Sequence, residues 1–157
     1  MLLAAAVTTP VPATAPACRA AQLSATLEDT RGKYAGMSHN GGVLHLVNVS
    51  RSACSVAATP KLEFYEANVT APLDIERDDS FGVQTARLTL APKANAYGLI
   101  RWVPNNVYQA GSCVAVASAG YVAGADGKIV PIAFASRMCG DPRGQRYEWQ
   151  RLSTTRP

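Results

Sequence analysis

The chain has 157 residues, of which 48% are hydrophobic and 17% are charged, and its formal net charge is +4. This length suits one domain with a substantial core, and the low charged fraction excludes an intrinsically disordered chain. The basic residues near the C-terminus are scattered, with Asp141 and Glu148 among them. Nucleic-acid binders cluster their basic residues, so we expect no nucleic-acid partner.

Residues 1–17 are expected to be a signal-peptide remnant or linker ahead of a single domain over residues 18–157. Residues 1–7 are apolar, and Ala15-Pro16-Ala17 fits the small-x-small rule for signal-peptide cleavage. No Lys or Arg precedes the apolar run, which favours a leader that has lost its first residues. A lipoprotein with a lipidated Cys18 is an alternative, although Ala15 stands where the lipidation motif prefers Leu. We expect export to the periplasm or the extracellular space, and no later stretch is apolar enough to span a membrane.

The cysteine pattern predicts two disulfides. The four cysteines are Cys18, Cys54, Cys113 and Cys139, and none of them lies in a C-x-x-C pair. This spacing gives no support to a zinc ribbon or a thioredoxin-type motif, whereas an even count in an exported chain indicates disulfides. Three pairings are open, and Cys18–Cys54 with Cys113–Cys139 is the simplest. In the chain-entropy model each such bond stabilises the fold by roughly 3–4 kcal/mol.

After Cys18 the chain divides into short apolar or alternating runs separated by turn residues, which is typical of an all-β fold. In chain order, the predicted strands are residues 20–27, 42–49, 61–66, 84–90, 96–103, 113–121 and 129–134, with a short terminal strand over 146–152. Loops are expected over residues 28–40 and over the acidic stretch 67–82, which has room for one short strand. Gly124-Ala125-Asp126-Gly127 predicts a hairpin, and Pro131 predicts an edge strand or a bulge.

Seven to eight strands at regular spacing predict an antiparallel β-sandwich. In such a sandwich Trp102 is expected to lie in the core and to pack against a disulfide. Residues 139–157 are compatible either with the sandwich or with a loose tail.

A set of residues in fixed order carries a resemblance to a known family: Cys18, Asn48-Val49-Ser50, Cys54, Pro60, Leu62, Phe64, Leu90-Ala91-Pro92, Trp102, Cys113 and Cys139. This order resembles the secreted bacterial domain-of-unknown-function family 4232 over nearly the whole chain after residue 17. The resemblance implies an immunoglobulin-like sandwich, export and cysteines paired in sequence order, and it implies no catalytic residue. Lys93 departs from the family, which commonly has Gly after this proline.

Two clusters are candidates for metal binding. Met37, His39 and His45 carry the kinds of side chain that bind copper, so a periplasmic small-ligand or copper-binding protein is the alternative function. The simpler interpretation is a loop histidine and a strand histidine that never meet. The acidic residues Asp74, Glu76, Asp78 and Asp79 lack the spacing of a calcium loop, which favours a solvated loop.

No enzyme motif is present in the sequence. It contains no G-x-S-x-G, and the cysteines are better used in disulfides, so we predict no catalytic residue and no cofactor. Tyr147 and Trp149 alternate with charged neighbours and are predicted to form an exposed partner contact. The leading hypothesis is an exported, non-enzymatic binding or interaction module of the cell envelope. We expect a monomer whose partner is a protein or another envelope component.

Overall fold

The computed structural model describes residues 15–29 and 32–157, and this part of the chain contains twelve strands and one short 3-10 helix. The elements in chain order are η1 (Ala20–Gln22), β1 (Leu23–Asp29), β2 (Asn40–Asn48), β3 (Cys54–Ala57), β4 (Leu62–Tyr65), β5 (Ile75–Arg77), β6 (Arg87–Leu90), β7 (Asn95–Trp102), β8 (Ser112–Val116), β9 (Ser118–Val122), β10 (Ile129–Ile132), β11 (Ser136–Asp141) and β12 (Gly144–Trp149).

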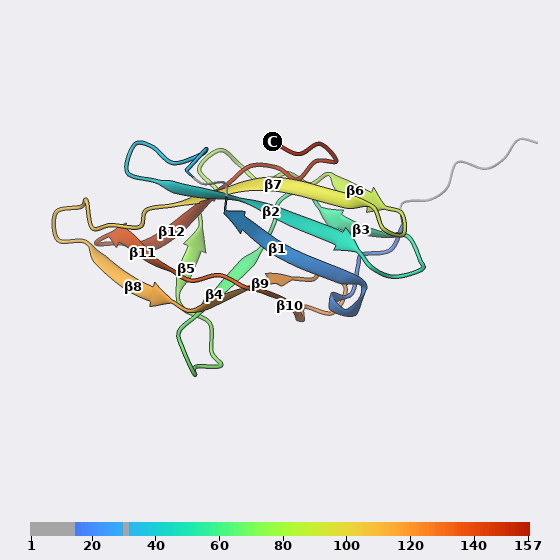
Figure 1. Ribbon diagram of the computed structural model, residues 1–157, viewed down its shortest axis with the longest axis horizontal. Coiled ribbons are helices and arrows are strands. Elements are labelled where there is room, and N and C mark those ends of the chain that lie inside the picture. The colour runs from blue at the N-terminus through green and yellow to red at the C-terminus, as the bar shows by residue number, and fades with distance from the viewer. Residues whose placement is uncertain (1–14, 30–31) are drawn as a thin grey trace, which may run out of the picture.

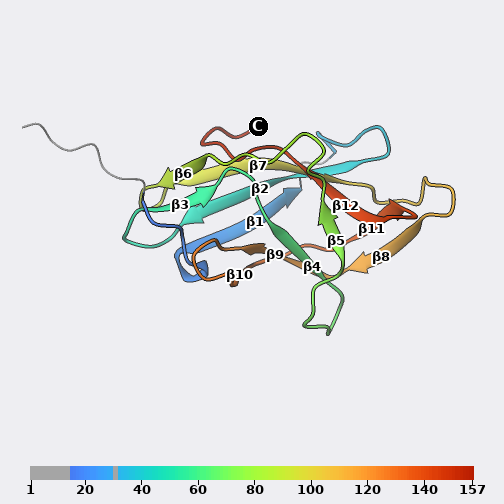
Figure 2. The same ribbon diagram turned by 180° about the vertical axis from the view of Figure 1, so that it is seen from behind.

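The strands form two main layers. The larger sheet has the order β1-β2-β7-β12-β11-β8, with β5 added in parallel to β12. Strands β10, β9 and β4 form a second sheet, which runs below β1, β2 and β7 in Figures 1 and 2. Strands β3 and β6 pair separately. The predicted all-β sandwich with two disulfides is confirmed, although the described residues form twelve strands where seven to eight were predicted.

The core lies between these two sheets. In β2 the alternating residues Leu44 and Leu46 are fully buried, as is Ile100 of β7, while Phe64 of β4 and Tyr121 of β9 come from the opposite sheet. Full burial of each large aliphatic or aromatic side chain stabilises the fold by roughly 1.5–3 kcal/mol. The hydrophobic effect on these alternating positions is therefore what holds the two sheets together.

Trp102 lies in the core, as the sequence predicts. Its ring packs edge-on against Phe134, with ring centroids 5.1 Å apart, and its Nε1 donates a hydrogen bond of 3.0 Å to Ser136 Oγ. A buried indole needs such an acceptor, because an unpaired N–H would carry the full cost of its desolvation.

The disulfides join Cys18 to Cys54 and Cys113 to Cys139, which confirms the sequential pairing. Because the Cys18 sulfur is bonded to Cys54, no thiol remains there for a lipid, which argues against the lipoprotein alternative. Cys113 and Cys139 are direct cross-strand partners in β8 and β11, so this bond fixes the outermost strand of the larger sheet.

Three features of the strand pattern differ from expectation. The predicted strand over residues 113–121 is interrupted at Ala117, so β8 joins the larger sheet and β9 joins the smaller one. The sequence stays apolar across this crossing, so no turn residue marks it. Strands β3 and β11 were not predicted, because neither shows a regular alternation of buried and exposed residues.

The C-terminal residues belong to the sandwich, so the loose tail considered for residues 139–157 is wrong. They contain the second half of β11 and all of β12, and Leu152 is fully buried. Ser153 exchanges two backbone hydrogen bonds of 2.8 Å with Tyr97 of β7. These bonds extend the sheet past the end of β12.

Two turns follow the expected chemistry. Residues 123–128 form the predicted hairpin between β9 and β10, and Pro131 lies on the edge strand of its sheet. Lys93 has φ +67°, a left-handed conformation that favours glycine. This conformation accounts for the glycine that the resembled family has at this position.

Candidate functional site

Tyr147 is buried, so its predicted role as an exposed contact is wrong. Its side chain is 1% exposed and packs edge-on against Phe64, with ring centroids 5.5 Å apart. The backbone N–H of Leu62 donates a hydrogen bond of 3.0 Å to the Tyr147 hydroxyl, and burial raises the pKa of that phenol. The alternation with charged residues that suggested exposure is the alternation of a strand with one face in the core.

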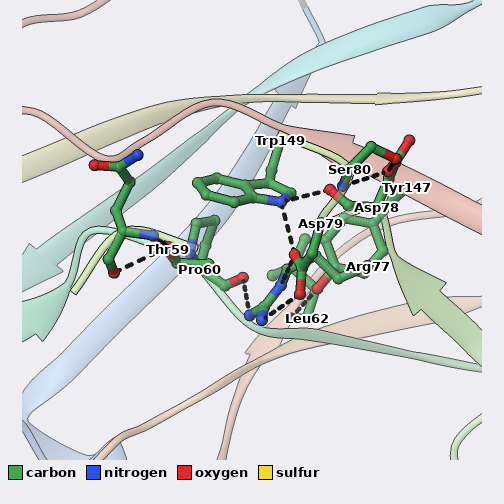
Figure 3. Close-up of polar contacts among 10 residues, drawn as sticks. Thr59, Pro60, Leu62, Arg77, Asp78, Asp79, Ser80, Tyr147 and Trp149 are labelled. Atoms are coloured by element: carbon green, nitrogen blue, oxygen red, sulfur yellow. Dashed lines mark hydrogen bonds and ion pairs between the residues drawn. The ribbon is translucent and has the colours of Figure 1, made fainter. Parts of the chain in front are cut away.

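Trp149, two residues further along β12, is half-buried and reaches the surface. Its indole packs against the core, and its Nε1 donates to the Asp78 carbonyl oxygen at 2.9 Å and to Asp79 Oδ1 at 3.1 Å. The Arg77 guanidinium lies over the ring, 5.9 Å from the centroid. Figure 3 shows this indole beside the loop that follows β5.

That loop, residues 78–84, is tied down at both ends. At its start Arg77 binds both carboxylate oxygens of Asp79 and donates to the Pro60 carbonyl oxygen at 3.2 Å (Figure 3). At its end the Gln84 N–H donates to Thr59 Oγ1 at 2.7 Å. Each anchor joins the loop to the chain just before β4, so the loop is held to the sandwich.

Between these anchors the loop exposes apolar side chains. Phe81 is 100% exposed and Val83 is 54% exposed. An apolar side chain in water gains nothing for folding, so a fixed loop that holds such residues outward is typical of a binding surface. Neither residue is among the predicted site residues, although two bulky apolar residues in an otherwise polar loop are a visible signal.

Two hollows adjoin the Phe81 loop, and both are lined by Asp78, Phe81 and Trp149. One has a volume of about 310 Å³ and is completed by Leu99, Arg101, Glu148 and Gln150. The other has about 190 Å³ and is completed by Gly82, Gln84 and Arg151. We call the two hollows and the loop between them the Phe81 surface.

The carboxylates that line this surface have polar or charged partners. Hydrogen bonds from the Ser80 hydroxyl and backbone N–H hold the pKa of Asp78 below its usual value, and the Arg77 guanidinium does the same for Asp79. Glu148 lies 2.9 Å from His39 Nε2 and 3.7 Å from Arg101 Nη1. A carboxyl with a lowered pKa is a poor proton donor near neutral pH, so Asp78 does not suit a general acid.

The residues of the alternative copper site do not meet. The His39 ring lies between Glu148 and the Met37 carbonyl oxygen, whereas the His45 ring lies between Glu28 and Asn95. Six residues of extended chain separate the two histidines by about 20 Å, far more than one ion can bridge.

The acidic residues of the stretch 67–82 also point to separate partners. Asp78 binds Ser80, Asp79 binds Arg77, and Glu76 lies 3.9 Å from Arg146. Among residues 15–29 and 32–157, no three Asp, Glu, His or Cys side chains are grouped as metal ligands would be. These carboxylates accept hydrogen bonds within the loop or pair with arginine side chains.

The comparisons with known proteins identify a family and no individual relative. No curated protein and no solved structure matches the chain. Within the described ranges, no helix is long and apolar enough to cross a membrane. The model of one family, the domain of unknown function DUF4232, matches residues 18–150. The chain therefore belongs to the DUF4232 family.

Proposed function

We propose that this protein is an exported, non-enzymatic binding module of the cell envelope, and that the Phe81 surface holds its ligand. The observation that carries the proposal is the fully exposed Phe81 on a loop anchored at both ends beside Trp149. A rigid contact surface loses little conformational entropy when a ligand binds, which favours affinity.

Export is supported by the use of the cysteines. All four are paired in disulfides, and such bonds persist in oxidising compartments such as the periplasm and the extracellular space. The periplasm or the extracellular space is therefore the proposed location. The predicted leader falls mostly on residues 1–14, outside the described residues.

A binding role, rather than catalysis, is supported by the hydrogen-bond partners of the two histidines and by the lowered pKa of Asp78. Both histidines lie against carboxylates, at 2.9 Å for His39 and 3.1 Å for His45, and both ring nitrogens of each histidine already have a hydrogen-bond partner. Asp78, the carboxylate shared by both hollows, has a lowered pKa. A carboxylate in this position is suited to accept hydrogen bonds from a ligand.

The test is co-sedimentation of the purified, oxidised protein with the envelope fraction of the cells that encode it. We expect wild-type protein in the pellet and the double variant F81A/V83S in the supernatant. The control variant V69S removes a similar exposed side chain, 45% exposed, from the loop between β4 and β5 (Figure 1). Equal sedimentation of wild type and F81A/V83S contradicts the assigned surface, and no sedimentation of wild type contradicts the function.

A further inference from the structure

We propose that the Phe81 surface binds an extended, uncharged carbohydrate chain. This inference rests on the proposed binding function and adds the chemical class of the ligand. Three properties of the surface carry it: its aromatic rings, its balanced charges and the shape of its hollows.

The rings supply the apolar contact. Phe81 and Trp149 line both hollows, and the Phe81 ring is fully open to solvent. The face of an aromatic ring carries partial negative charge. One face of a sugar ring presents C–H bonds with partial positive charge, so sugars stack on such rings while their hydroxyl groups point outward.

The charges of the two hollows cancel. Their charged side chains are Arg101, Arg151, Asp78 and Glu148, two of each sign. Such a balanced set gives no electrostatic preference for an anion or a cation, unlike a basic cluster or an acidic cluster. An uncharged ligand rich in hydrogen-bonding groups matches it best.

The same side chains suit pairs of hydroxyl groups. Guanidinium, carboxylate and amide groups are planar, and each offers two neighbouring donors, acceptors or one of each. The amides of Gln84 and Gln150 and the Arg151 guanidinium line the hollows, and no hydrogen bond from these side chains to another described residue is present. They are available to vicinal hydroxyls of a sugar.

The dimensions indicate a chain rather than a compact ligand. Volumes of about 310 and 190 Å³ lie at or below the lower end of the roughly 300–1,000 Å³ of most small-molecule pockets. A third hollow of about 170 Å³ shares Asp78, Arg101 and Glu148 with the first and continues to Tyr108. Adjacent shallow hollows of this kind suit successive units of a polymer.

A protein partner fits these observations less well. The centres of protein interfaces are depleted of charged residues and are more apolar than their rims. Here Asp78 and Trp149 lie together where the two larger hollows meet, and charged residues line each hollow. A carbohydrate tolerates this mixture because each sugar presents polar and apolar groups side by side.

The experiment measures binding to cell walls of the encoding organism, freed of protein by hot detergent and protease. We expect wild-type protein to bind these walls, and periodate, which cleaves vicinal diols, to abolish binding. The variant F81L keeps an apolar side chain but removes the ring, and it should bind at least tenfold more weakly. The control V69S should match wild type.

Each outcome bears on the carbohydrate proposal. Binding that survives periodate, binding of F81L equal to that of wild type, or binding only to walls not treated with protease overturns it. In the last case the envelope-binding function stands and the partner is a protein. If wild type binds neither treated nor untreated walls, the proposed function fails as well.

Discussion

Replacing Tyr147 by Phe isolates one buried hydrogen bond. The variant keeps the ring that packs against Phe64 and removes the hydroxyl that accepts the Leu62 N–H at 3.0 Å. A buried donor left without an acceptor costs about 1–3 kcal/mol. For a domain of this size each kcal/mol shifts Tm by roughly 2–4 °C, so a loss of about 2 kcal/mol lowers Tm by roughly 4–8 °C.

The assay is guanidinium unfolding of Y147F under non-reducing conditions, followed by tryptophan fluorescence. The matched control is Y108F, because Tyr108 is 37% exposed and its hydroxyl forms no hydrogen bond with another described residue. We expect the control to stay within about 0.5 kcal/mol of wild type, as surface substitutions usually do. If Y147F also lies within this range, the Leu62 N–H is satisfied elsewhere and the reasoning is refuted.

Three further predictions concern the turns and the ion pairs. N48A should lose about 3 kcal/mol of unfolding free energy, because Asn48 is fully buried and its side-chain amide forms several hydrogen bonds. The amide nitrogen donates to the Ser52 and Leu90 carbonyl oxygens, and the amide oxygen accepts from the Ser50 N–H. Urea unfolding measures this loss, and an unchanged midpoint would contradict it. K93G should raise Tm by roughly 2–4 °C, since glycine relieves the strain of the left-handed conformation, which is worth about 1 kcal/mol. Calorimetry measures the Tm of K93G, and K93A, which keeps a Cβ at this position, is the control. The hydrogen bond from Arg156 holds the pKa of Glu28 below the ordinary glutamate value of 4.5. The folded-state pKa is therefore lower than the unfolded one, and this pair stabilises the protein above about pH 4.5 and loses its effect as the pH falls through the folded pKa. In a profile of unfolding free energy measured from pH 7 to pH 3, E28Q should reduce the loss of stability at acidic pH. The reduction should be less than about 1 kcal/mol because the pair is exposed. A profile equal to that of wild type would contradict the role given to the Glu28–Arg156 pair.

Local sequence patterns were sufficient to predict much of the fold. The largely apolar runs of residues 42–49 and 96–103 predicted β2 and β7, which pair with each other at the centre of the larger sheet. The family resemblance and the cysteine order predicted both disulfides. These features depend on neighbouring residues or on the order of the cysteines along the chain, which a sequence displays directly.

Other features depend on packing between distant segments. The chain passes from one sheet to the other at Ala117, whose N–H binds the Tyr65 carbonyl oxygen, and no local residue signals that partner. The charged neighbours of Tyr147 suggest an exposed side chain, whereas the alternation along β12 turns this residue toward the core. The Phe81 surface combines residues from β5's loop, β7 and β12, so its assembly follows only from the pairing of those strands.

The two anchors hold the 78–84 loop to the sandwich, so the stability of the fold does not depend on the exposed residues between them. Gly82 has φ +84° with no atom within 4 Å of a Cβ added there, and Phe81 and Val83 are mostly or fully exposed. Changes at positions 81 and 83 therefore leave the core untouched. In evolution such a loop can acquire a new specificity by point substitution, and in protein engineering it is a natural place to graft a foreign recognition sequence.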